Sequence, residues 1–300
     1  MKFGKVDTIE GIDFSLPEID QRSRTVLSSF PKTKQPEIRI GCSVWSNKDY
    51  VGSVYPLKTP QSKFLQAYTQ QFNTVEVNAT RYGMPKTSTL KGWKEKAPAG
   101  FKFSFKVPQP ITNRKNLNDD EGIIRMDQFA AGMDLMGDKA GTSFIMLPQY
   151  FGLDRHEQLN TFLKNWPVEL SASLELREPV MIHHERVRSL AETKRMSMCV
   201  TDTPGRRDVL HNYLTNEELY VRYAGTTDFD NSRARINDWV QRSAQLIELG
   251  VQRIYFMIHQ PADERGSALE VARLFSKGIL DHYPNANVTI PINHKQNTLF

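Results

Sequence analysis

The stretch ASLELREP, residues 172–179, alternates apolar and charged side chains in a way that constrains the fold. Successive side chains of a β-strand point to opposite faces, so Leu174 and Leu176 lie on one face. Glu175 and Arg177 then share the other face. Such a pairing suits a solvent-exposed face or the polar interior of a closed sheet, and the rest of the chain favours the second.

Strand-like runs recur along the chain with helical patterns between them. The runs are 38–44, 74–78, 101–107, 142–147, 170–176, 196–201, 219–224 and 251–258. The clearest helical patterns are 61–72, 121–137, 154–165, 184–194, 232–249 and 264–277, with fainter ones at 86–97 and 205–213. This alternation predicts a parallel α/β fold of the TIM type, a (β/α)8 barrel. An open doubly wound sheet is the rival fold, but no glycine-rich phosphate fingerprint follows an early strand.

The barrel domain is expected to cover residues 37–280. Residues 1–36 are polar and interrupted by Pro17, Pro31 and Pro36, which predicts an N-terminal extension packed outside the barrel or across one end. Residues 281–300 are irregular and polar, and they are expected to form a C-terminal tail.

The composition indicates a globular protein in a reducing compartment. Of 300 residues, 39% are hydrophobic and 24% charged, and no apolar run approaches the roughly 20 residues of a membrane span. The N-terminus lacks the apolar core of a secretion signal. Only Cys42 and Cys199 are present, without metal-ligand spacing, so a cytoplasmic protein is expected. The net charge of +5 is compatible with a polyanion but describes an ordinary, slightly basic surface equally well.

The alternation within each strand predicts which side chains fill the barrel interior. Strands of such barrels place their chemistry at their carboxyl ends, and several ionisable residues are expected there. These residues are Glu76, Lys106, Glu175, Arg177 and Arg222, together with Asn78, Asp202 and His259. An isolated buried charge lowers stability by roughly several kcal/mol, so these acids and bases are expected to pair.

The same ionisable ring has a purely structural interpretation as an internal salt-bridge network without a ligand. Arg39 and Lys102 lie near the strand starts, where this structural interpretation is favoured.

The motifs around these residues resemble the YecE-like family of unknown function. The matching stretches are IGCSVWS, YVGSVYP, FNTVEVNATRY, GFKFSFKVPQPIT, LPQYF, LELRE and YVRYAG, in register over about residues 38–278. The resemblance implies a TIM-type barrel and no established reaction. The matching polar positions are Trp45, Tyr55, Glu76, Asn78, Lys106, Glu175, Arg177, Asp202 and Arg222.

Three positions depart from the family pattern. Asn113 stands where the family usually has a histidine, and Arg81 stands where an aromatic residue is frequent. The last strand continues as IHQPADERG, residues 258–266, in place of an asparagine-rich stretch. These departures indicate a ligand or chemistry different from that of a typical member.

Other residues bear on the ligand. Trp45 and Tyr55 flank the first loop and could stack on a base or sugar ring, or pack as a lid. Basic residues in loops favour an anionic ligand, and Gly205 stands near a possible helix start that could hold phosphate. These basic residues are Arg114, Lys115, Arg206, Arg207, Arg233 and Arg235. Histidines are too scattered for a zinc centre, so no metal or other cofactor is expected, although a single Mg²⁺ is compatible with the carboxylates.

Two functions follow from this site. The first is an enzyme, such as a hydrolase or phosphodiesterase-like enzyme, acting on a phosphate- or sugar-containing anion. Glu76 or Glu175 would be its base, Lys106 would stabilise charge or donate a proton, and Arg177 and Arg222 would bind the anion. Lys106 could form a Schiff base if its pKa were depressed, but nearby acids are expected to keep it protonated. The second is a non-catalytic nucleic-acid-binding protein that uses basic loops and aromatic stacking. A membrane partner is not expected, and the sequence leaves the oligomeric state open.

Overall fold

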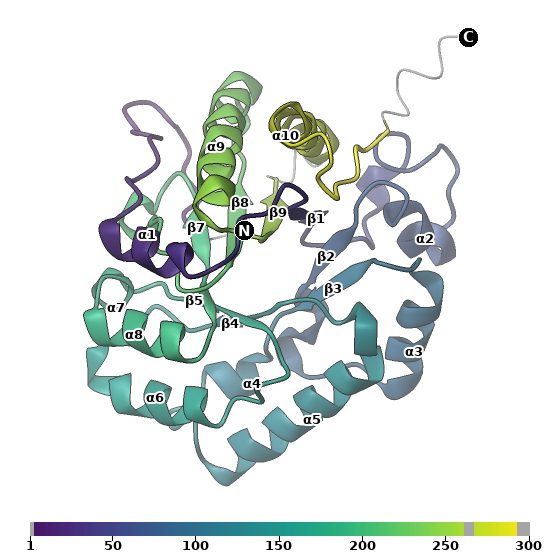
Figure 1. Ribbon diagram of the computed structural model, residues 1–300. Helices are drawn as coiled ribbons and strands as arrows, with labels where there is room; N and C mark the ends of the chain where they lie inside the picture. Colours follow the sequence, from purple (N-terminus) through teal and green to yellow (C-terminus); the bar gives the residue numbers. More distant parts are fainter. Residues whose placement is uncertain (1–2, 261–266, 293–300) are drawn as a thin grey trace.

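A computed structural model describes residues 3–260 and 267–292 of the chain, and its strands lie inside a surround of helices (Figure 1). The strands are β1 (Glu37–Cys42), β2 (Thr74–Val77), β3 (Lys102–Phe105), β4 (Ser143–Met146), β5 (Ala172–Glu175), β6 (Ser197–Met198), β7 (Val200–Asp202), β8 (Glu218–Ala224) and β9 (Arg253–His259). The helices are α1 (Gln21–Ser28), α2 (Phe64–Tyr68), α3 (Thr87–Lys96), α4 (Gln109–Thr112), α5 (Asp120–Met136), α6 (His156–Lys164), α7 (Pro179–Ile182), α8 (Glu185–Thr193), α9 (Phe229–Leu249) and α10 (Ala268–His282).

The sheet arrangement corrects the sequence prediction. The strands form three parallel sheets of four, two and three strands, in the orders β1-β9-β8-β7, β2-β3 and β4-β5-β6. The expected parallel α/β fold is present, but the expected single closed barrel of eight strands is wrong. The reason lies in how the sheets end.

The sheet edge at β1 is closed by groups that do not belong to a strand. The N–H of Ile38 donates to the carbonyl of Asn287 (3.1 Å), and the N–H of Ile40 donates to Oδ1 of Asn73 (2.8 Å). The N–H of Cys42 donates to the hydroxyl of Tyr68 (2.6 Å), which in turn donates to the carbonyl of Thr74 at the start of β2. Because side chains and the tail take these hydrogen bonds, no β1–β2 ladder forms.

The other two sheet boundaries have different causes. Between β3 and β4 the backbone contacts are isolated, with bridges from Phe103 to Ala140 and from Lys106 to Phe144. The predicted strand 196–201 divides at Cys199, whose N–H donates to the carbonyl of Leu174 (3.0 Å). Its first part, β6, pairs with β5, and its second part, β7, pairs with β8. One run of apolar residues therefore changes partner in mid-course.

The helices bury the outward side chains of the strands. Phe256 of β9 stacks on Phe275 of α10 with ring centroids 4.2 Å apart, and Trp239 of α9 is fully buried beside it. The fainter pattern at 86–97 forms α3, whereas 205–213 contains only a short 3-10 turn, Arg207–Val209. The expected helix 264–277 appears as α10, and its first residues lie outside the described part of the chain.

The N-terminal extension contains a helix that packs on the main body. Asp20 caps α1 through the N–H of Ser23 (2.8 Å) and also pairs with Arg188 of α8 (2.5 Å). Gly250, which ends α9 with φ of 134°, approaches α1 so closely that a Cβ there would lie 2.3 Å from the carbonyl oxygen of Leu27. Only glycine fits this contact.

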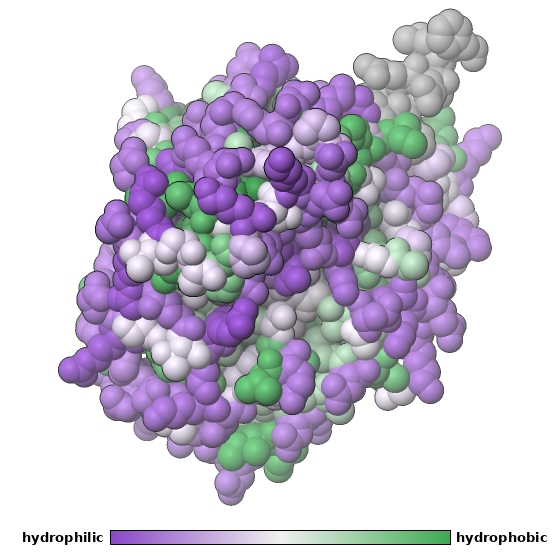
Figure 2. Space-filling model, in the orientation of Figure 1, coloured by the Kyte–Doolittle hydropathy of each residue, from purple (hydrophilic) through white to green (hydrophobic). Residues whose placement is uncertain are grey.

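The surface has no broad apolar area on the face shown in Figure 2, where hydrophilic residues predominate and apolar ones are scattered. No helix in the described ranges is both long and apolar enough to cross a membrane.

Candidate functional site

A buried arginine joins the three sheets at one point in the interior. Arg222 of β8 donates from Nε and Nη2 to the two carboxylate oxygens of Glu76 on β2, at 2.8 Å each. Its Nη1 donates to Oε2 of Glu175 on β5 (2.6 Å). Glu76 and Glu175 are fully buried and Arg222 is 3% exposed. The strand alternation therefore points these three predicted residues toward a common centre.

All three groups are charged at neutral pH. Burial acts to raise the pKa of Glu76, but the charge of Arg222 and the hydrogen bonds from Arg222 and His259 outweigh it and hold that pKa well below its ordinary value. Burial likewise acts to raise the pKa of Glu175, and Arg222 and Arg177 together lower it. The two carboxylates in turn hold the pKa of Arg222 well above its ordinary value, against the effect of burial.

Arg177 lies at the edge of this cluster beneath the N-terminal extension. Its Nε donates to Oε1 of Glu175 (2.8 Å), and its guanidinium lies 4.3 Å from the ring centroid of Phe3. The guanidinium of Arg206 lies 4.8 Å from the same ring. The N–H of Gly205 donates to the carbonyl of Gly4 (2.9 Å). Residues 3 and 4 thus cover one side of the cluster, a role that the polar sequence of the extension did not reveal.

His259 and Asn78 complete the surroundings of Glu76. Asn78 donates from Nδ2 to Oε1 of Glu76 (2.7 Å), and Nε2 of His259 lies 3.2 Å from Oε2. An ionised carboxylate can only accept, so Nε2 of His259 carries the hydrogen. Burial lowers the pKa of His259 although Glu76 acts to raise it, so the ring is neutral at pH 7. Its Nδ1, for which the described residues show no hydrogen bond, then carries the ring's lone pair.

Lys106 differs from the two arginines of the cluster because it has no carboxylate partner within the described ranges. It follows β3, is 6% exposed, and its Nζ lies 3.3 Å from the Sδ of Met146, a weak acceptor. Burial lowers the pKa of Lys106 to about 8, although Glu175 and Glu76 act to raise it. The sequence led to the expectation that nearby acids hold this lysine protonated; the acids do act to raise its pKa, but the effect of burial is larger.

The sequence did not identify Met146 as a site residue, because residues 144–147 are all apolar and the alternation could not separate an interior face from an outward one. Phe144 belongs to the same interior face, and its ring centroid lies 4.9 Å from the guanidinium of Arg222. The two-residue spacing of Phe144 and Met146 does place both side chains on the same face of the strand.

Trp45 and Tyr55 are not brought to the cluster. Tyr55 is fully buried and its hydroxyl donates to the carbonyl of Trp45 (2.5 Å). The ring of Trp45 packs edge-on against Trp93 of α3 (4.9 Å) and lies near Phe103. These aromatic residues pack in the helix layer, so neither forms a stacking platform at the cluster.

Asp202 also lies apart from the predicted site. Thr201 is in register with Arg222, so Thr201 shares its interior face and Asp202 points to the opposite one. There its carboxylate pairs with Arg235 of α9 (2.8 Å) and with Arg207, and it accepts from Nε1 of Trp239 (2.8 Å). The sequence placed Asp202 at the carboxyl end of this strand without deciding which face it takes, and the register with β8 turns it away from the cluster.

Most of the basic residues singled out in the sequence pair with acids. Besides the two on Asp202, the pairs are Arg114 with Asp119 (2.6 Å), Arg206 with Asp208 (2.8 Å) and Arg233 with Asp230 (3.6 Å). Five of the six basic residues singled out in the sequence therefore have an acidic partner.

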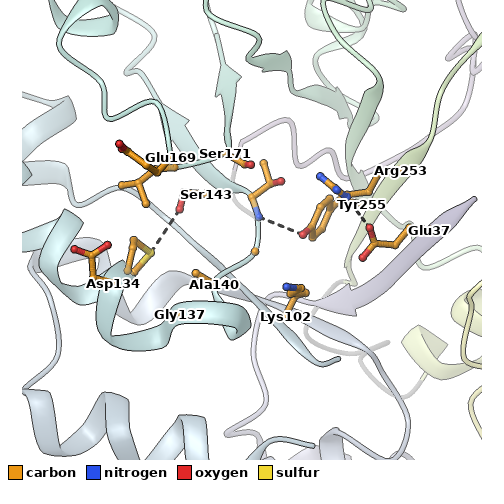
Figure 3. Close-up of a pocket in the computed structure, with 14 residues that line it drawn as sticks. Glu37, Lys102, Asp134, Gly137, Ala140, Ser143, Glu169, Ser171, Arg253 and Tyr255 are labelled. Atoms are coloured by element: carbon orange, nitrogen blue, oxygen red, sulfur yellow. Dashed lines mark hydrogen bonds and ion pairs between the residues drawn. The ribbon is translucent and has the colours of Figure 1, made fainter. Parts of the chain in front are cut away.

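A cavity lies at the opposite, amino-terminal ends of the strands (Figure 3). It measures about 420 Å³ and is lined by charged groups that include Glu37, Lys102 and Arg253. Arg253 pairs with Glu37 (2.7 Å) and Glu218 (3.2 Å), and Lys102 donates to the carbonyl of Asp138. Arg39 pairs with Glu37 as well. These partners match the structural interpretation given to Arg39 and Lys102 from the sequence.

The described residues contain no group of three or more His, Cys, Asp or Glu side chains placed to hold a metal ion. Cys42 and Cys199 are both free and buried, and burial raises the pKa of Cys42 to about 12. A thiol with so high a pKa is a poor nucleophile.

The fold and the cluster define a parallel α/β protein with a buried Glu–Arg–Glu triad and a neighbouring lysine at the carboxyl ends of its strands. The chain belongs to the family described as "Protein of unknown function DUF72", whose model matches residues 39–289. It is 25% identical to the UPF0759 protein YecE of Escherichia coli K12 over 219 residues, covering 66% of this chain and 79% of that protein. It is 35% identical over 78 residues to the UPF0759 protein YunF of Bacillus subtilis 168, covering 26% and 27% of the two chains.

Solved structures share the fold. A DUF72 family protein from Enterococcus faecalis V583 matches with a TM-score of 0.64 at 17% identity, over 82% of this chain and 98% of that one. A DUF72 family protein from Thermotoga maritima MSB8 matches with a TM-score of 0.62 at 21% identity, over 82% and 99%. The resemblance inferred from the motifs is thereby confirmed at the level of the family.

Proposed function

We propose that the chain is an enzyme that binds a small anionic ligand, such as a phosphate- or sugar-containing acid, at the carboxyl ends of its strands. The observation that carries this proposal is Lys106, a buried ammonium group that faces two carboxylates already engaged by arginines. A cation kept without an ion-pair partner in a protein interior costs stability, and such costs concentrate at functional sites.

The charge of the cluster supports an anionic ligand. The two carboxylates of Glu76 and Glu175 are balanced by the two guanidinium groups of Arg222 and Arg177. A protonated Lys106 then leaves one positive charge in excess, which attracts an anion in a low-dielectric interior.

Arg177 is the group best placed to grip that anion. Within the described residues, the hydrogen bond of Arg177 to Glu175 is made by Nε and neither Nη group takes part. The side chain of Arg177 is 17% exposed. The remaining Nη groups match the spacing of phosphate or carboxylate oxygens.

The catalytic roles differ from those expected from sequence. Glu76 and Glu175 have lowered pKa values and are bonded to Arg222, so we assign them to holding Arg222 and shaping the field around Lys106. Lys106, with a pKa of about 8, is the acid–base group, because efficient proton transfer requires a pKa near the working pH.

The test is ligand binding by calorimetry and thermal shift, with phosphate and a set of sugar phosphates as probes. Wild-type protein is compared with Lys106→Met and Arg177→Met, and Lys102→Met is the matched control from the other end of β3. We expect binding in wild type and in the control, and a loss of at least roughly tenfold in affinity when a charged contact is removed. Equal affinity in all four proteins would refute the site.

The same samples examine binding to nucleic acid. Single-stranded and duplex oligonucleotides titrated at low and moderate salt should bind weakly and without saturation. Tight binding with a steep salt dependence would instead support the nucleic-acid-binding alternative.

A further inference from the structure

We propose that Lys106 forms an imine with the aldehyde or ketone carbonyl of a small substrate that carries a carboxylate or phosphate. This inference rests on the proposed function, because the anionic group would be held by the same cluster. It adds the reaction type and the class of substrate.

The first argument is the acceptor at Nζ. Lys139 is also largely buried, but its Nζ donates to the carbonyl oxygens of Ala97 (2.8 Å) and Pro98 (2.6 Å). Lys102 donates to the carbonyl of Asp138. Lys106 has instead the thioether of Met146 at 3.3 Å, which stabilises an ammonium hydrogen far less than an oxygen does.

The second argument is the placement of the surrounding charges. Glu76 on β2 and Glu175 on β5 are close enough to influence Lys106, yet their oxygens are bonded to Arg222 on β8 and to Arg177. The two arginines oppose protonation of Lys106 and the two carboxylates favour it, while burial disfavours the charge outright. The amine form is therefore accessible near neutral pH, with a pKa of about 8.

The reaction balances without any further reactant. The neutral Nζ attacks the carbonyl carbon and forms a C–N bond, and the oxygen takes up a proton as the carbinolamine. The nitrogen gives up both hydrogens overall, and they leave with the carbonyl oxygen as water. Nδ1 of His259, beside Glu76, is the neutral base available in the cluster to move a proton, and no oxidant or reductant is consumed.

The experiment traps the imine by reduction. Wild-type protein is treated at pH 8 with sodium cyanoborohydride and either glyoxylate, a small anionic aldehyde, or formaldehyde, a small neutral one. Modified lysines are identified by peptide mass mapping against time. We expect Lys106 to react roughly tenfold faster than Lys102 or Lys139, because its Nζ has only a thioether as acceptor whereas theirs donate to carbonyl oxygens. The rates are compared between residues of one folded protein, so a variant that fails to fold cannot obscure the comparison.

Two further outcomes separate this inference from the proposed function. If formaldehyde modifies Lys106 first but glyoxylate shows neither saturation nor competition by phosphate, the imine stands and the anion site fails. If Lys106 reacts no faster than Lys102 with either aldehyde while phosphate still binds, the imine is overturned and the anion site stands. Lys106→Arg, which keeps the charge and removes the reactive amine, serves as the blank for adduct mass.

Discussion

Arg222 and Glu76 form a bidentate pair across two different sheets, with both nitrogen–oxygen distances at 2.8 Å and both side chains almost completely buried. Among the described residues no backbone ladder joins β8 to β2, so this bidentate pair is what holds the two strands at a fixed spacing. The pair therefore supports the fold as well as the charge balance, and removing it should change how the free energy of unfolding depends on pH.

Replacing Arg222 by methionine should destabilise the protein by roughly 3–5 kcal/mol at pH 7, since two buried carboxylates lose their partner. In wild type the lowered pKa of Glu76 adds stability above its unfolded pKa, and this stability is lost at lower pH. In the variant, burial raises that pKa instead, so the penalty should shrink toward pH 5. Urea unfolding at both pH values measures this, with the exposed pair variant Arg233→Met as control.

Glu175→Gln separates function from stability. Arg222 keeps both hydrogen bonds to Glu76, and Arg177 is partly exposed, so the fold should survive while anion binding and Lys106 reactivity change. The neighbouring Leu174→Ala should cost about 2–5 kcal/mol of stability, because Leu174 is 1% exposed. A strongly destabilised Glu175→Gln with unchanged affinity per folded molecule would favour an internal salt-bridge network without a ligand.

Lys106→Met should stabilise the fold. Below pH 8 the lysine is charged in both states, and the folded state carries the cost of burying that charge. The cost disappears as pH rises from about 8 to the ordinary value of 10.5. The gain from methionine should therefore be largest below pH 8, at most on the order of 3 kcal/mol, and should fade toward pH 10.5. Denaturant titrations across pH 6–10 would show it, and a variant less stable than wild type throughout would contradict it.

Asp202→Asn should lower stability without touching the site. Arg235 is 2% exposed and depends on this carboxylate, so its loss should cost roughly 3–5 kcal/mol. Ligand affinity of the folded fraction should stay unchanged, because Asp202 faces α9. Reduced affinity in the folded fraction would contradict this prediction and support the sequence-based assignment of Asp202 to the ligand site.

The site could be predicted wherever alternation was clear. Glu175 and Arg222 each stand between apolar neighbours, so their interior face followed from a two-residue period. Asp202 was placed at the site because it ends a strand, and the register of Thr201 with Arg222, which turns Asp202 toward α9, could not be read from the sequence.

The sheet boundaries could not be predicted from pattern alone. The edge of β1 is closed by Asn73, Tyr68 and the backbone of Asn287, which are distant in sequence or outside any strand. Hydropathy describes which face of a strand is buried, but it carries no information on which group accepts each backbone N–H.

The joining of three sheets by one guanidinium also bears on the order in which the molecule assembles. Arg222 meets Glu175 across 47 residues of chain and Glu76 across 146, so these contacts close long loops. Contacts of such separation form late and slow the folding of a domain. The cluster therefore forms only when all three sheets have come together. After dilution from denaturant, the return of ligand binding or Lys106 reactivity would then report the completion of folding rather than the initial hydrophobic collapse.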